Sequence, residues 1–266
     1  MIKSTILMAG RPVGKLGNQL FQYHLISQLA MKFKMSKISF GWNNELKLFN
    51  NINVIKGLPN LFSSASIKKS ELSNGLTREL ENRIKELSQK KGMLLLEPGI
   101  LGEVFFDVCY KDPKSIFQIS NRELKDKNAG IAIHFRGKDF KEWNSKAIFE
   151  PEYYINALNQ LFSIGYENEM VTLHTDDPQH ENVVKIRSYL NCNIEINHKK
   201  SFFDIVNSKA VIMSPSTYCF WASILGSKKI LVHNREWIIS RIEAGEKFWI
   251  DLYNGGNKFV SIDYFV

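Results

Sequence analysis

The sequence contains little cysteine and no long apolar run. Its three cysteines, Cys109, Cys192 and Cys219, are scattered and have neither metal-site spacing nor a disulfide framework. No apolar run approaches the roughly 20 residues of a membrane span. Lys3 and Arg11 interrupt the first apolar stretch too early for an export signal. We therefore expect a cytoplasmic protein with buried thiols. The sequence also has no Asp-x-Asp block and no His or Cys ligand spacing, so we expect no obligatory metal ion and no cofactor.

The net positive charge comes entirely from the first half of the chain. Residues 1–126 hold 19 Lys and Arg against 11 Asp and Glu, and residues 127–266 hold 16 of each. This half therefore carries the whole net charge of +8, which suits an anionic membrane surface, a phosphorylated lipid or a nucleic acid. A solvated lysine-rich face explains the charge equally well. Because the sequence has no basic stripe with interleaved aromatic residues, we expect no nucleic-acid partner.

A buried strand that ends in a polar turn is the most informative motif. Residues 131–135 are apolar except for His134, and a turn containing Arg136 and Asp139 follows them. Open α/β folds bind ligands at this end of a strand. The arginine presents a fixed fork of donors, which suits a phosphate group. The alternative is an ordinary ion pair at a strand end, and His134 is then a structural hydrogen-bond partner.

Polar turns follow two further expected strands in the second half. Because strands alternate with helices there, we expect a parallel sheet whose strand ends meet at one edge. Hydroxyl groups in these turns suit a pyrophosphate, and carboxylates suit ribose hydroxyls or guanine, although aspartates also cap helices. The residues of these two turns are Asp176 and Asp177 in one, and Ser214, Ser216 and Thr217 in the other.

The N-terminal stretch predicts a strand, a glycine loop and a helix. The strand is expected over residues 3–9 and the helix over residues 20–33, with an apolar stripe along the helix. This layout points backbone N–H groups at an anion, although a tight turn without a ligand is equally compatible with the glycines. The loop is not a Walker A motif, because Leu16 stands where Ser or Thr must bind Mg²⁺. Two amide side chains follow a glycine at the helix start, in the sequence Gly17, Asn18, Gln19.

The chain is long enough for two domains with separate cores. The polar, charged segment 122–128 is the best candidate for their boundary. We expect an N-terminal domain over residues 1–126 and a C-terminal domain over residues 127–266.

Four blocks of sequence resemble the glycosyltransferase family 11 α-1,2-fucosyltransferases, within the wider group of GDP-fucose fucosyltransferases. Residues 14–23 (GKLGNQLFQY) are similar to the opening motif of this family, and residues 134–140 (HFRGKDF) to its H-x-R-R-G-D-Y motif. Residues 174–178 (HTDDP) resemble its S-D-D turn. Asp204, together with the block that begins at Ser214, resembles its last motif.

The resemblance implies a GT-B architecture, in which two Rossmann-type α/β domains face each other across a cleft. The acceptor side would be N-terminal and the donor side C-terminal. The reaction would be a metal-independent, inverting transfer of L-fucose from GDP-fucose to a glycan hydroxyl, with an α-1,2 linkage, in surface polysaccharide or lipopolysaccharide synthesis. Arg136 would be the phosphate ligand and His134 the first candidate for a base. The implied donor-binding residues are Gly17, Asn18, Gln19, Lys138, Asp139, Asp176, Asp177, Asp204, Ser214, Ser216 and Thr217.

The sequence departs from the family pattern at several positions. Gly137 replaces the second arginine of H-x-R-R, and Lys138 replaces the glycine that follows it. These changes leave another GDP-sugar, another nucleotide sugar or a non-catalytic sugar-nucleotide-binding protein as alternatives, and a nucleic-acid-binding module as a remote one. An acceptor linked to a lipid diphosphate would place the basic half at the inner face of a membrane.

Overall fold

The computed structural model describes most of the chain in two compact units. The described residues are 5–9, 14–41, 45–56, 65–72, 76–90, 92–97, 113–120, 123, 130–226, 229–245, 249 and 258–262. One unit ends at Ser120, and the second contains the described residues from Glu123 to Gly245 with Trp249 and the last strand.

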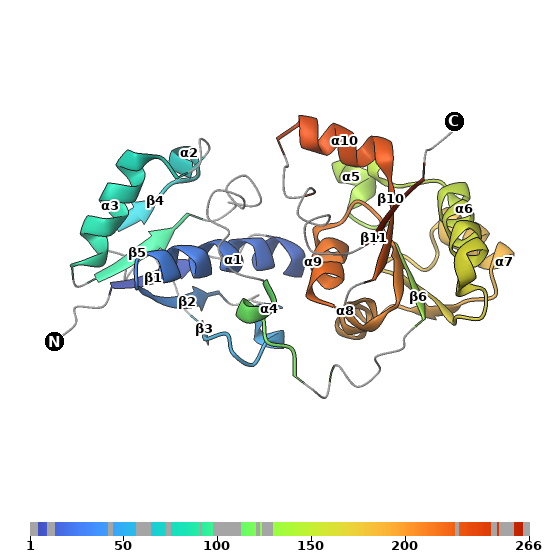
Figure 1. Ribbon diagram of the computed structural model, residues 1–266, viewed down its shortest axis with the longest axis horizontal. Coiled ribbons are helices and arrows are strands. Elements are labelled where there is room, and N and C mark those ends of the chain that lie inside the picture. The colour runs from blue at the N-terminus through green and yellow to red at the C-terminus, as the bar shows by residue number, and fades with distance from the viewer. Residues whose placement is uncertain are drawn as a thin grey trace. The chain divides into compact units, whose positions relative to one another are not determined.

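The first unit is a parallel sheet in the order β3-β2-β1-β5-β4. Its strands are β1 (Thr5–Ala9), β2 (Ser36–Phe40), β3 (Val54–Ile55), β4 (Ala65–Ile67) and β5 (Gly92–Leu96). Its helices are α1 (Leu16–Lys32), η1 (Glu45–Leu48), α2 (Lys69–Leu72), α3 (Arg78–Ser88) and α4 (Pro113–Ile116). Figure 1 shows α1 lying along β1 and β2.

Helix α1 is buried on nearly every side. Of its 17 residues 14 are buried, including Gln22, His24 and Gln28. The Gln28 amide and the His24 ring form a hydrogen bond at 3.1 Å. Burial, with a smaller contribution from the charge of Lys37, lowers the pKa of His24 to about 3. The expected single apolar stripe is therefore too narrow a description of this helix, which is central to its unit.

The second unit is a parallel sheet in the order β11-β10-β9-β6-β7-β8. Its strands are β6 (Ile131–Phe135), β7 (Val171–Thr175), β8 (Asn193–Glu195), β9 (Ala210–Ile212), β10 (Ile230–Asn234) and β11 (Lys258–Ile262). Its helices are α5 (Phe140–Trp143), η4 (Ser145–Ala147), α6 (Pro151–Leu161), η5 (Phe162–Tyr166), α7 (Glu181–Tyr189), α8 (His198–Asn207), α9 (Thr217–Leu225) and α10 (Arg235–Glu243).

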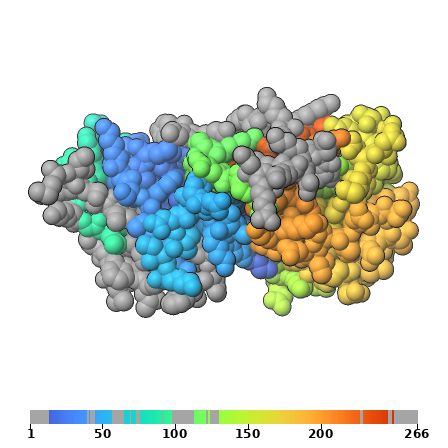
Figure 2. Space-filling model, turned by 90° about the horizontal axis from the view of Figure 1, so that it is seen from below, coloured from blue at the N-terminus to red at the C-terminus, as the bar shows by residue number. Residues whose placement is uncertain are grey.

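Helices cover both faces of this sheet. Helix α6 packs against α7 on one face, and α8 packs against α9 on the other (Figure 1). Every residue of β6, β9 and β10 is buried, as expected for parallel strands covered on both sides. In space-filling form the helices from α6 to α8, yellow to orange, make a continuous surface (Figure 2).

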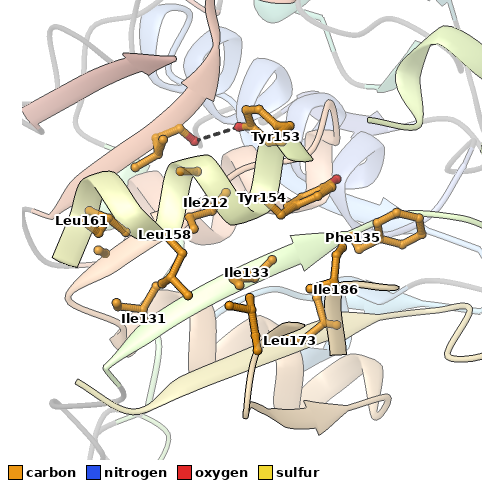
Figure 3. Close-up of a cluster of buried hydrophobic side chains, with 14 of the residues drawn as sticks. Ile131, Ile133, Phe135, Tyr153, Tyr154, Leu158, Leu161, Leu173, Ile186 and Ile212 are labelled. Carbon is orange, nitrogen blue, oxygen red and sulfur yellow. Dashed lines mark hydrogen bonds between the residues drawn. The ribbon is translucent and has the colours of Figure 1, made fainter. Parts of the chain in front are cut away.

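The core of the second unit lies between β6 and α6 (Figure 3). Ile131 and Ile133 of β6 belong to the same buried cluster as Leu158 of α6. The Tyr153 hydroxyl in this cluster donates to the carbonyl oxygens of Met213 at 2.9 Å and Val232 at 3.3 Å. This core holds α6 rigidly over the strands whose ends carry the polar turns.

The expected α/β fold class is confirmed, and most of the expected elements are present. Helix α1 starts at Leu16, four residues before the expected helix, and Pro151 occupies the first turn of α6 as expected. The sequence did not indicate β3 and β4, because two and three residues are too few to show an alternation of apolar and polar residues. It also did not indicate β11. Cys109 and most of the expected boundary segment lie outside the described residues. Within the described ranges, no helix is both long and apolar enough to cross a bilayer.

Candidate functional site

The carboxyl ends of β6, β7 and β9 meet at one edge of the second sheet. His134 of β6 is paired in register with His174 of β7, and Ile133 with Ile212 of β9. The polar turns that follow these three strands therefore start at the same level. This is the arrangement that the sequence predicted, and it is where parallel α/β sheets bind ligands.

Arg136 is nearly buried at this edge, with 9% of its surface exposed. Its Nε and Nη2 each donate to a carboxylate oxygen of Asp139 at 2.7 Å. Asp176 Oδ2 lies 3.1 Å from Nε as an ion-pair partner. Burial alone would lower the pKa of Arg136, but the hydrogen bond to Asp139 and the charges of Asp176 and Asp139 outweigh it and raise that pKa. The guanidinium is thus charged and fixed in orientation, and Nη1 has no hydrogen-bond partner among the described residues.

Asp176 holds the turn that carries Arg136. Its Oδ1 accepts the backbone N–H of Gly137 at 2.9 Å, and that of Lys138 at 3.5 Å. Asp177 pairs with Lys141 Nζ at 3.4 Å, and its backbone N–H donates to Thr175 Oγ1. The two aspartates that the sequence suggested for a ribose or base thus also have contacts within the chain.

Gly137 lies against this aspartate pair. A Cβ at this position would be 2.8 Å from the Cβ of Asp177, closer than real side chains come. The glycine that replaces the family's second arginine is therefore required by the packing of the turn on Asp177.

His134 is held by Ser214 across the strand ends. Its Nδ1 lies 2.5 Å from Ser214 Oγ, and its ring stacks on Tyr218 with centroids 5.5 Å apart. Burial, followed by the positive charge of Arg136, holds the pKa of His134 well below its ordinary value. His134 is therefore neutral at pH 7, so its imidazole can accept a proton only weakly.

A cavity of about 40 Å³ lies beside Arg136. His134, Arg136, His174, Asp176, Ser201 and Tyr218 are among the residues that line it. A space of this size holds at least one water molecule, so it can admit a small polar group of a ligand.

The remaining predicted residues of this unit surround that edge. Ser216 precedes α9 as its N-cap residue but makes no capping hydrogen bond with its side chain, and Thr217 begins the helix. Lys138 is exposed in the turn after β6. Asp204 lies on α8, pairs with Lys200 Nζ at 3.2 Å and does not line the cavity.

The N-terminal motif lies at the start of α1 in the first unit. The Gln19 side chain donates to the Gly14 carbonyl at 3.0 Å and accepts the Glu45 N–H at 2.8 Å. The Glu45 carboxylate accepts the first helical N–H, that of Leu16, at 2.6 Å. Gln19 and Glu45 therefore fix this loop, and a carboxylate occupies the helix position that was expected to attract an anion. Gly17 is buried, and Asn18 is half-buried with its side chain over Gly14.

Sequence reasoning missed six residues that line the cavity: His174, Thr175, Ile196, His198, Ser201 and Tyr218. His174 and Tyr218 fall inside two of the blocks that carry the family resemblance, which was the available signal. His198 and Ser201 come from α8, whose first turn the sequence did not indicate as helical.

Three solved structures resemble this chain over most of its length. One, titled as the ADP-heptose lps heptosyltransferase II of E. coli, matches with a TM-score of 0.51 and 14% identity, over 86% of this chain and 85% of that chain. Fucosyltransferase NodZ from Bradyrhizobium matches with a TM-score of 0.53 and 12% identity, over 84% and 94%. NodZ α-1,6-fucosyltransferase co-crystallized with GDP matches with a TM-score of 0.53 and 10% identity, over 88% and 96%.

The chain has the fold of the GT-B glycosyltransferases. At these identities the likeness concerns the fold alone. No family model and no curated protein sequence matches the chain. Membership of glycosyltransferase family 11 and the cleft between the domains therefore stay predictions.

Proposed function

We propose that the protein is a glycosyltransferase whose donor is a nucleoside-diphosphate sugar, with GDP-fucose as the first candidate. The observation that carries this proposal is the placement of Arg136. It is a charged, nearly buried arginine fixed at the ligand-binding edge of a GT-B-type sheet. The fucosyltransferase titles among the structural neighbours support the choice of donor.

The geometry suggests how the diphosphate would be stabilised as the sugar leaves. Asp139 takes Nε and one N–H of Nη2, which leaves Nη1 for a phosphate oxygen. Ser216 and Thr217 at the start of α9 would add hydroxyl and backbone N–H donors. Fixed donors of this kind stabilise developing negative charge without having to reorient. We expect transfer with inversion and without an obligatory metal ion.

The acceptor side is proposed from the resemblance and the charge distribution. We propose a glycan hydroxyl as acceptor, with an α-1,2 linkage, and the domain of residues 1–126 as its binding side. Its excess of basic residues supports contact with an anionic membrane face that carries a lipid-diphosphate-linked glycan. Binding to anionic vesicles should then fall as salt rises, and salt-independent partition would contradict this part of the proposal. His134 is neutral and bound to Ser214, so we assign no general base.

A thermal-shift panel tests the donor. GDP and GDP-fucose should raise the melting temperature, since a ligand that binds only the folded state stabilises it, and UDP should not. Arg136→Ala should fold normally, lose the shift and lose transfer of fucose to glycan acceptors. Near-normal turnover by folded Arg136→Ala would overturn the assignment. GDP binding without transfer to any acceptor would indicate a non-catalytic binding protein instead.

A second candidate is transfer from another nucleotide sugar. The structural likeness to a heptosyltransferase titled for ADP-heptose supports it. Stabilisation by ADP-heptose but not by GDP-fucose would favour this alternative.

A further inference from the structure

Two residues that line the cavity beside Arg136 each have a buried polar atom without a hydrogen bond to any of the described residues. These atoms are Nδ1 of His174, which is 1% exposed, and Oδ2 of Asp176. Asp176 Oδ2 lies 3.1 Å from Arg136 Nε as an ion-pair partner. Buried polar groups are rarely left unpaired in folded proteins, so a missing group is expected to satisfy them.

The chemistry of these two atoms restricts what can enter. A carboxylate oxygen can only accept a hydrogen bond. Burial lowers the pKa of His174 to about 4, so its ring is neutral at pH 7 and offers one donor and one acceptor. The entering group must therefore be able to donate. A phosphate oxygen cannot donate and would place negative charge against Asp176, whereas a hydroxyl group donates and accepts.

The volume of the cavity is compatible with such a group. About 40 Å³ has room for a hydroxyl group. Because the Asp176 carboxylate lines the cavity, we expect the diphosphate outside it, on Arg136 and the start of α9.

We infer that this cavity is a subsite for one hydroxyl group of the donor, and that His174 is the residue that makes the site selective for it. The inference rests on the proposed function. Both the ribose and the transferred sugar are joined directly to the diphosphate, so either can supply the hydroxyl. The carboxylate of Asp176 holds the turn through Oδ1, and Asp176 also lines the subsite, to which it adds a negative charge.

Calorimetric binding of four ligands tests the inference. The probes are GDP, 2′-deoxy-GDP, 3′-deoxy-GDP and GDP-fucose. The proteins are the wild type, His174→Phe and the control His233→Phe. Phenylalanine keeps the ring and removes both nitrogens. His233 is as buried as His174 and lies at the end of β10, but it does not line this cavity.

A ribose hydroxyl in the subsite predicts that the wild type binds GDP up to about tenfold more tightly than one deoxy analogue. This preference should vanish in His174→Phe and persist in His233→Phe. If a hydroxyl of the transferred sugar occupies the subsite instead, His174→Phe should weaken the binding of GDP-fucose by the same factor and leave the binding of GDP unchanged.

Identical ligand preferences in the wild type and His174→Phe, in proteins that bind GDP, would overturn the inference alone. The cavity would then hold only water. Failure of the wild type to bind any guanine nucleotide would overturn GDP-fucose as the donor, and the inference with it.

Discussion

Arg136 and Asp139 form a two-point salt bridge, in which Nε and Nη2 of the arginine donate to the two carboxylate oxygens at 2.7 Å each. The two residues are only three positions apart, so the turn itself brings them together. The pair fixes the plane of the guanidinium before any ligand arrives. Asp176 follows the neighbouring strand, 39 positions beyond Gly137. It accepts the Gly137 N–H and pairs with Arg136, so it stabilises the same turn.

Arg136→Lys should lower the rate of sugar transfer almost as much as Arg136→Ala. An ammonium group keeps the charge but cannot reproduce a planar fork shared between carboxylate and phosphate. We expect the rate of transfer to fall by about 10²–10³-fold, the usual effect of losing one preorganised donor. Steady-state transfer from GDP-fucose measures the effect, and Arg187→Lys on the exposed side of α7 is the matched control. If Arg136→Lys transfers fucose at a rate within a few-fold of the wild type, a positive charge alone is enough for transfer.

Asp176→Ala should destabilise the second unit by about 1–3 kcal/mol, because the N–H of the buried Gly137 loses its acceptor. Asp176→Asn retains an acceptor oxygen, so its free energy of unfolding should fall clearly less. Urea unfolding of both variants measures the difference. Equal losses would mean that the ion pair with Arg136, rather than the turn, is what Asp176 contributes.

Gly137→Ala should lower the free energy of unfolding by roughly 1–3 kcal/mol, the usual cost of overpacking. Its new Cβ would be 2.8 Å from the Cβ of Asp177. Asp177→Gly removes that atom, so the double variant should be more stable than the sum of the two single losses. Strictly additive losses in this double-mutant cycle would show that Gly137 is needed for a reason other than this contact.

Stability should fall as the pH is lowered from about 6.5 towards 4. Burial lowers the pKa of His174 and of His233 to about 4, from an ordinary value of 6.5. The unfolded chain therefore binds protons in this range before the folded chain does, and each histidine costs about 3 kcal/mol across the range. Urea midpoints at pH 7.5, 6 and 5 measure the slope. His174→Phe should flatten it, and an unchanged slope would contradict the lowered pKa.

Much of the second unit was predictable from local patterns. The apolar residues 131–135 and the glycine-containing turn after them indicated β6 correctly, and Pro151 marked the start of α6. Helix α1 was harder to describe, because Gln22, His24 and Gln28 are polar yet buried. Their burial is possible because they find partners inside the protein, and the order of polar and apolar residues does not show that. The two residues of β3 are too few for any periodicity to be detected.

The sequence alone determined that polar turns would follow successive parallel strands and share one edge of a sheet, because alternating strands and helices leave few other arrangements. The tertiary structure decided which side chains meet there. Asp176 contacts the turn of Arg136, and Ser214 contacts His134. His174 lines a small cavity, and its Nδ1 has no hydrogen-bond partner in the part of the chain that the structure describes. Hydrogen bonds act over about 3 Å. Such contacts between residues 39 or 80 positions apart depend on the packing of whole strands and helices, which no local pattern encodes.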